Sequence, residues 1–88
     1  MNRMPIIEIY TQAFCPYCAR ALSLLRKKGV EFKEIDAPAG SAQRAQARER
    51  AGGKTSVPQI FFDGKLIGGC DDMMALERAG KLDMLLGQ

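Results

Sequence analysis

The alternation of apolar and polar positions divides the chain into short segments with strand and helix patterns. Residues 6–10 form a β-branched apolar run, which predicts a buried strand. Across residues 16–28, leucine and alanine recur at helical spacing, basic residues fill the last turn, and Gly29 is placed to end a helix. Residues 30–35 alternate well enough to predict a second strand. Strand, helix and strand in this order predict a parallel pair joined by a right-handed crossover.

The middle of the chain predicts a helix followed by a hairpin. Residues 41–51 are rich in Ala, Gln and Arg with a thin apolar stripe, which predicts an exposed helix that ends at two glycines. Residues 59–62 and 65–67 then flank the dipeptide Asp63-Gly64, which is favoured in tight type I′ turns. We therefore expect these two strands to be antiparallel.

The last third of the chain predicts one more helix. Asp71 or Asp72 can cap it, and Gly80 can close it. Its apolar positions are Met73, Leu76 and Ala79, and residues 82–86 form a short amphipathic tail.

Length predicts one domain that spans residues 1–88. We expect it to act as a monomer, although the sequence does not fix the oligomeric state. The composition, 47% hydrophobic and 26% charged, is typical of a soluble globular protein. The net charge of +3 is mild and spread along the chain, so we expect no nucleic-acid partner. No apolar run is long enough to cross a membrane and the first residues do not resemble a signal peptide, so we expect a cytoplasmic protein without a membrane partner.

The cysteines carry the candidate chemistry. The chain has three, Cys15, Cys18 and Cys70, and a thiol-reducing cytoplasm would keep them out of permanent disulfides. It has no histidine, which excludes Ser-His and Cys-His catalysis within this chain. A reactive cysteine here must therefore be activated by other means.

The helix start provides such a means. Proline is favoured at the first helical position, so Pro16 would make Cys15 the N-cap residue. The Cys15 sulfur would then face the free N–H groups of Tyr17 and Cys18 and the positive end of the helix dipole, and both favour a thiolate. Cys15 is the candidate nucleophile. Cys18 lies one turn deeper, should stay mostly protonated, and can reach Cys15 as a resolving thiol.

Two plainer interpretations of the pair remain. Structural zinc takes four Cys or His ligands, and three cysteines without histidine could complete such a site only with a partner chain, so we expect no metal. Two inert core cysteines are the other alternative, and the proline between them at a strand-to-helix junction argues against it.

These motifs together resemble the glutaredoxins, in their dithiol form. The resemblance runs through nearly the whole chain in the segments 8–11, 15–18 (Cys-Pro-Tyr-Cys), 57–61 (Val-Pro-Gln-Ile-Phe) and 68–72 (Gly-Gly-Cys-Asp-Asp). It implies an α/β thioredoxin fold, with a four-stranded mixed sheet flanked by helices in the order β-α-β-α-β-β-α. It also implies that Pro58 is in the cis form, opposite the cysteines.

The resemblance further implies a glutathione site. A cis turn would present the Val57 backbone to a peptide-like ligand, Tyr17 would pack beside it, and the acidic end of the site would accept from its ammonium group. The residues implied to bind glutathione are Gln12, Cys15, Tyr17, Ser56, Val57, Pro58, Gly69, Cys70, Asp71 and Asp72. Plain alternatives are an exposed helix residue for Tyr17, an ordinary turn for Gly68-Gly69 and a helix cap for Asp71 or Asp72. For Cys70 they are a buried inert thiol or an oxidation-prone one.

Two positions depart from the family pattern. Family members commonly carry a lysine where this chain has Gln12, so one source of positive charge near the thiolate is missing. Gln12 can still form hydrogen bonds, and Lys54, Arg44 or Arg48 could supply charge, although a solvated helix face is the favoured interpretation of the two arginines. Ser56 in place of threonine keeps a hydroxyl group.

The function implied is a glutathione-dependent thiol-disulfide oxidoreductase that reduces protein disulfides and glutathione mixed disulfides through Cys15 and Cys18. Glutathione would be a co-substrate, with no tightly bound cofactor, and the protein partners would carry disulfides or bound glutathione. One alternative is a thioredoxin-like reductase fed by a flavoprotein reductase, although the chain has no tryptophan and carries Pro-Tyr between its cysteines. Others are a glutathione-assisted metal or iron-sulfur carrier, which Pro16 disfavours, and a non-catalytic binding module.

Overall fold

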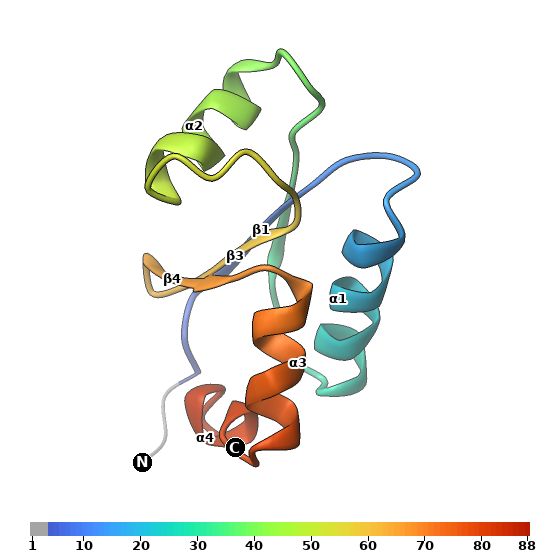
Figure 1. Cartoon of the computed structure of the whole chain (residues 1–88). Coiled ribbons are helices and arrows are strands. Elements are labelled where there is room, and N and C mark those ends of the chain that lie inside the picture. The colour runs from blue at the N-terminus through green and yellow to red at the C-terminus, as the bar shows by residue number, and fades with distance from the viewer. Residues whose placement is uncertain (1–3) are drawn as a thin grey trace.

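The computed structural model describes residues 4–88, and within them it contains one mixed sheet and four helices (Figure 1). The strand order is β2-β1-β3-β4, with β1 and β2 parallel and the other two neighbouring pairs antiparallel. This is the thioredoxin fold that the sequence predicted, with the C-terminal tail forming one further short helix, α4. In chain order the elements are β1 (Ile7–Thr11), α1 (Pro16–Lys27), β2 (Lys33–Asp36), α2 (Ala42–Arg50), β3 (Gln59–Phe62), β4 (Lys65–Gly68), α3 (Cys70–Arg78) and α4 (Leu82–Leu85).

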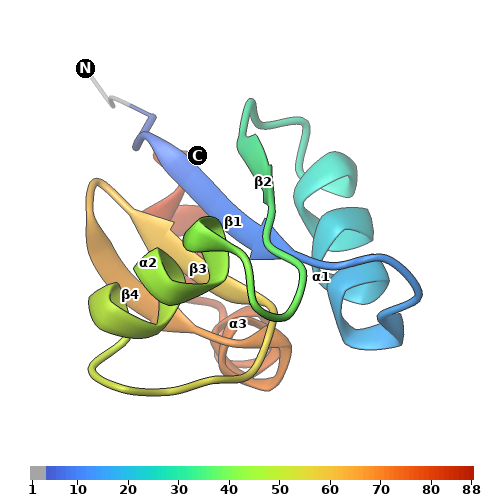
Figure 2. The ribbon, with the colours of Figure 1, turned by 90° about the horizontal axis from the view of Figure 1, so that it is seen from above.

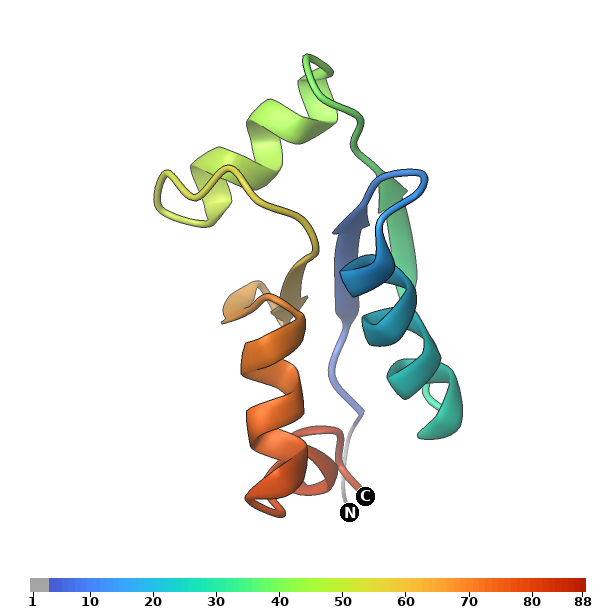
Figure 3. The ribbon, with the colours of Figure 1, turned by 45° about the vertical axis from the view of Figure 1, so that its right-hand side comes forward.

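The sheet separates two apolar cores, because successive side chains of a strand point to opposite faces. Ile7 and Ile9 of β1 pack with α1 and α3 in the larger core. Tyr10 packs on the other face with Phe61 of β3 and with Ala47 of α2. Figures 1 and 3 show α2 apart from the α1 and α3 pair. The helices therefore cover both faces of the sheet.

Helix α1 has the ends that the sequence predicted. Pro16 is its first residue, Lys28 is its C-cap, and Gly29 follows with φ of 70°, a left-handed conformation that favours glycine. At 12 residues, α1 is the longest helix between residues 4 and 88. None of the helices in that range is long and apolar enough to cross a membrane.

Strand β2 begins later than predicted. The alternation suggested a strand from residue 30, but the ladder with β1 starts at the pair Glu8 and Lys33. Val30 is nevertheless buried, and Phe32 packs against the same larger core. Their apolar character therefore reflects core packing of the connection between α1 and β2.

The predicted hairpin is confirmed. Asp63 and Gly64 have φ of 50° and 80°, the two positive values that a type I′ turn requires, and β3 and β4 pair on either side. The Asp63 carboxylate accepts a hydrogen bond from the Ile6 N–H at 2.8 Å, which ties the turn to the chain entering β1.

The predicted cap of α3 is wrong by two or three positions. The N-cap is Gly69, and Asp71 and Asp72 lie within the first helical turn. The Asp72 carboxylate reaches back to accept from the Gly69 N–H at 2.9 Å. The helix can begin this early because Gly68 adopts φ of 120° and Gly69 is extended. This backbone leaves the Gly69 N–H free to donate to the Asp72 carboxylate.

Candidate active site

Cys15 is held at the N-cap of α1. The loop that leaves the end of β1 carries the chain to this helix start (Figure 2). Cys15 is extended, Pro16 is the first helical residue, and the Cys15 sulfur accepts the Cys18 N–H at 3.2 Å. The Cys18 N–H is one of the two backbone donors predicted for this sulfur, and the helix dipole faces the sulfur as predicted. The half-buried Cys15 side chain remains open to solvent on one side.

Cys18 lies in a different environment, although it is only one turn away. Its side chain is 2% exposed. Burial, followed by the hydrogen bond with the Cys15 sulfur, raises the pKa of the Cys18 thiol to about 12. Cys18 therefore stays protonated at neutral pH, in keeping with the unequal roles that the sequence predicted for the two thiols.

The segment before β3 lies against Cys15. The Val57-Pro58 peptide bond is cis, as the resemblance implied. The Cys15 thiol is oriented to donate to the Val57 carbonyl, with the sulfur 3.9 Å from the oxygen. The buried Gln59 side chain donates from Nε2 to the Ser56 carbonyl at 2.9 Å, and this hydrogen bond stabilises the turn.

The start of α1, the segment before β3 and the start of α3 converge at one end of the molecule (Figure 3). A pocket of about 270 Å³ is lined by residues of all three segments. We call it the Val57 pocket. Its lining includes both Lys54 and the two aspartates of α3, so it can receive a ligand that carries both charges. The residues that line it are Tyr17, Lys54, Ser56, Val57, Pro58, Gln59, Gly69, Cys70, Asp71 and Asp72.

Cys70 contributes a third sulfur to this pocket. Its side chain is buried, and burial followed by the charge of Asp71 raises the pKa of the Cys70 thiol. A protonated thiol is a poor nucleophile. Cys70 is the first residue of α3 and so also lies at a helix start, but it is buried, whereas the Cys15 side chain remains partly exposed.

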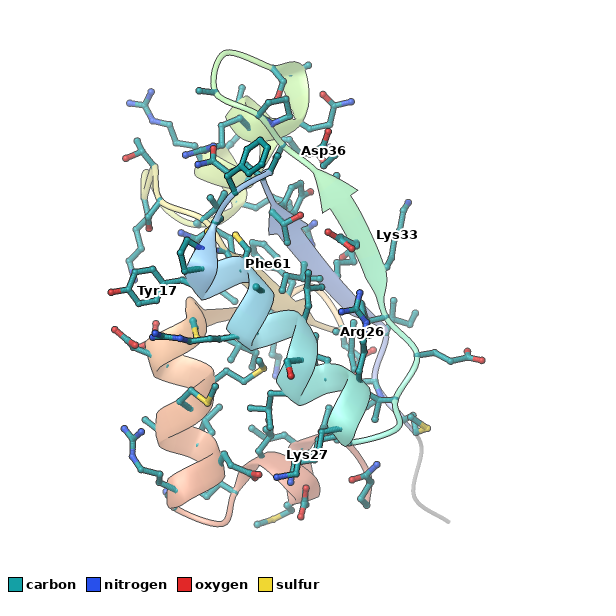
Figure 4. The ribbon with its side chains drawn as sticks, turned by 90° about the vertical axis from the view of Figure 1, so that its right-hand side faces the viewer. Tyr17, Arg26, Lys27, Lys33, Asp36 and Phe61 are labelled. Carbon is teal, nitrogen blue, oxygen red and sulfur yellow. The ribbon has the colours of Figure 1, made fainter. Side chains whose placement is uncertain are left out.

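A second hollow lies on the other side of Cys15, between α1 and the edge strand β2. We call it the Phe14 groove, and its volume is about 420 Å³. Figure 4 shows that Tyr17 points away from the side of α1 along which β2 runs, marked by Lys33 and Asp36. The groove is lined by Thr11, Gln12, Phe14, Cys15, Pro16, Cys18, Ala19, Leu22 and Glu34.

The predicted glutathione residues are therefore divided between two hollows. Eight of them, from Tyr17 to Asp72, line the Val57 pocket together with Lys54 and Gln59. Gln12 and Cys15 line the Phe14 groove instead, and so does Cys18. Cys15 thus lies on the ridge between the two, close to the Val57 carbonyl on one side and to the groove on the other.

Arg44 corrects one interpretation of the sequence. A solvated helix face was favoured for it, but its guanidinium donates to Gln12 Oε1 at 2.7 Å, to the Ala37 carbonyl at 3.0 Å and twice to the Thr55 carbonyl. It therefore joins three loops around the site and lies beside the residue that replaces the family lysine. Arg48, one turn later, is exposed as expected.

Three residues near the cysteines have roles that the sequence did not predict. The roles of Arg44 and Gln59 depend on acceptors far along the chain, and no local pattern signals them. The sequence does indicate an exposed ring at Phe14, because this aromatic residue lies between the predicted strand and helix and directly before the reactive cysteine. Its ring is fully exposed and its φ is 59°.

A thioredoxin fold with a cysteine pair at the start of its first helix and a cis-proline turn opposite defines a class of thiol redox proteins. The family model described as glutaredoxin matches residues 7–67 of this chain. The chain belongs to the glutaredoxin family.

Curated relatives agree over nearly the whole chain. Glutaredoxin 3 of Escherichia coli is 51% identical over 83 residues, which cover 94% of this chain and 99% of that protein. A probable glutaredoxin of Synechocystis is 56% identical over 80 residues, which cover 91% of each chain.

Solved structures agree as well. The solution structure of a Brucella melitensis glutaredoxin has a TM-score of 0.82 and 54% identity, covering 96% of this chain and 90% of that one. The crystal structure of a buckwheat glutaredoxin-glutathione complex has a TM-score of 0.81 and 32% identity, covering 93% of this chain and 76% of that one.

Proposed function

We propose that this glutaredoxin reduces glutathione mixed disulfides and protein disulfides with electrons from glutathione. The single observation that carries the proposal is the position of the Cys15 sulfur. It lies at the N-cap of α1 and beside the Val57 carbonyl that borders a charged pocket. The solved complex of a related glutaredoxin with glutathione supports glutathione as the ligand of that pocket. Such an activity belongs in a thiol-reducing compartment such as the cytoplasm.

Glutathione fits the Val57 pocket as an extended tripeptide. Its backbone would pair with that of Val57, Tyr17 would cover its middle, and its γ-glutamyl ammonium would lie near Asp71 and Asp72. Lys54, which also lines the pocket, suits a carboxylate of glutathione. Gln12 would act from outside this pocket, through its hydrogen bond with Arg44.

The one-cysteine route uses Cys15 alone. The Cys15 thiolate attacks the glutathione sulfur of a mixed disulfide, the new sulfur-sulfur bond forms, and the protein leaves as a thiolate that takes up a proton. A second glutathione then attacks the bound glutathione sulfur. Oxidised glutathione departs, and Cys15 returns to the thiolate.

The two-cysteine route adds Cys18. The Cys15 thiolate attacks one sulfur of a protein disulfide, and the other protein sulfur leaves as a thiolate. The Cys18 thiol passes its proton to that thiolate and attacks the Cys15 sulfur, so the second protein sulfur leaves, takes up a proton, and the reduced protein is released. The resulting Cys15-Cys18 disulfide accepts two electrons from two glutathiones. The high pKa of Cys18 keeps it from competing with Cys15 for the substrate in the first step.

A coupled turnover assay tests the proposal. We expect Cys15→Ser to abolish activity on both substrates, and Cys18→Ser to spare a glutathione mixed disulfide while slowing protein disulfide reduction. Equal losses from the two substitutions would contradict the division of roles. Wild-type protein that is reduced by a flavoprotein reductase but not by glutathione would establish the thioredoxin-like alternative instead.

A further inference from the structure

Phe14 is in an unfavourable position for a residue that only stabilises the fold. Its aromatic ring is fully exposed, so it gains nothing from burial. Its backbone has φ of 59°, a left-handed conformation that is uncommon for residues other than glycine. Within the described residues the only other non-glycine residue with positive φ is Asp63, which sits in a type I′ turn that requires it. Phe14 also lies in a turn, at residues 13–14 directly before the nucleophile, but a positive φ in a turn favours glycine or asparagine over an aromatic residue.

The Phe14 groove continues from this ring along one side of α1. Pro16, Ala19 and Leu22 supply an apolar wall, and the edge strand β2 supplies the opposite wall through Glu34. Cys15 and Cys18 both line this groove, and neither lines the Val57 pocket. A partner joined to Cys15 can therefore extend along the groove while the resolving thiol lies at the same hollow.

The charge of the groove differs from that of the Val57 pocket. Glu34 is the one acidic or basic side chain among the described residues that line the groove. Thr11 holds it in place, because the Thr11 hydroxyl donates to Glu34 Oε2 at 2.8 Å. Glutathione carries two carboxylates, so an apolar groove with a fixed carboxylate disfavours it. A polypeptide with a basic side chain beside an apolar one fits instead.

We propose that the Phe14 groove binds the stretch of a protein substrate next to its reacting cysteine, with an apolar side chain against Phe14 and a lysine or arginine toward Glu34. This inference rests on the proposed function and adds the substrate class to it. The Val57 pocket then serves glutathione, and the groove serves the protein that donates the disulfide. The different charges of the pocket and the groove thus match the different charges of glutathione and the protein substrate.

Two cyclic peptides provide the test. Each contains a disulfide between two cysteines, with a leucine and a second residue outside the ring; that second residue is arginine in one peptide and glutamate in the other. The mixed disulfide of cysteine and glutathione serves as a small substrate that needs no groove. Turnover is measured with glutathione as reductant.

We expect wild-type protein to prefer the arginine peptide by about fivefold in kcat/KM, the effect of one partly exposed charge pair. Glu34→Gln should remove the preference, and Glu34→Lys should reverse it. Phe14→Ser should lower kcat/KM for both peptides by about fivefold, through lost apolar contact. Each variant should turn over the small mixed disulfide at the wild-type rate.

Matched controls separate the groove from general effects of charge and hydrophobicity. Glu31→Lys makes the same charge change just before β2 but outside the groove, and Met84→Ser removes another exposed apolar side chain, from α4. Both should behave as wild type with the peptides. A peptide preference that is unchanged in Glu34→Lys, or changed equally by Glu31→Lys, overturns the inference and leaves the proposed function intact. Failure of wild-type protein to turn over the small mixed disulfide overturns both.

Discussion

Cys15 and Cys18 are a single helical turn apart, yet the fold gives their sulfurs different chemistry. The Cys15 sulfur meets a free backbone donor at the helix start and remains accessible, whereas Cys18 faces the interior. The difference follows from Pro16, which begins the helix and so places Cys15 at its cap. This part of the site was predictable because it depends on neighbours in the sequence.

Alkaline pH should destabilise the reduced protein through Cys18. Burial raises the pKa of this thiol from its ordinary value of 9.0 to about 12 in the folded state. The stability contributed by the buried thiol is therefore complete below about pH 9 and is lost as the pH rises toward 12.

Urea unfolding of reduced protein at about pH 7 and about pH 10 measures this effect, with Cys18→Ala as the reference. Wild-type protein should lose about 1 to 2 kcal/mol more than the variant between the two conditions. Equal losses would mean that Cys18 titrates normally in the folded protein.

Gly68 is a position where only glycine fits. It has φ of 120°, and a Cβ atom there would collide with the Asp72 carboxylate that caps α3. Gly68→Ala should therefore cost about 2 to 3 kcal/mol of unfolding free energy and weaken glutathione binding.

The matched control for Gly68 is Gly80→Ala. Gly80 has φ of 72° with open space around it, so alanine there should cost only about 1 kcal/mol. Denaturant midpoints of the two variants give the comparison. If they lose the same stability, backbone conformation alone matters and the contact with Asp72 does not.

Helix α2 contributes to the site through Arg44, although it lies on the far side of the sheet from α1. The Arg44 guanidinium joins Gln12, Ala37 and Thr55, each from a different loop. The sequence showed a polar helix and favoured a solvated face, since periodicity reveals which residues share a face but not which loops approach it. The late start of β2 has a similar cause, because only its pairing with β1 decides where the strand begins.

Arg44→Met should loosen this junction. The Thr55 and Ala37 carbonyls would lose their donor, so we expect a loss of about 1 to 2 kcal/mol in unfolding free energy and a higher KM for glutathionylated substrate. Arg48→Met on the same helix removes an exposed side chain and should change stability by less than about 0.5 kcal/mol. Urea unfolding and steady-state kinetics of both variants give the answer, and similar effects would show that Arg44 is merely another surface residue.

The whole molecule brings its site together at one end of the sheet. The start of α1, the cis turn before β3 and the start of α3 meet there, although they are far apart in the sequence (Figures 1 and 3). Element order and the resemblance predicted this meeting. They did not predict that Cys15 stands between two hollows, because that depends on side chains such as Phe14 and Glu34 that no motif contains.

Capture of glutathione by Cys15 is the central claim, and intact mass spectrometry tests it most directly. Reduced Cys18→Ser protein is mixed with oxidised glutathione, and the adduct is located by peptide mapping. The account predicts one glutathione per chain, bound to Cys15 and removed by added glutathione. An adduct on Cys70, or no adduct at all, would contradict it.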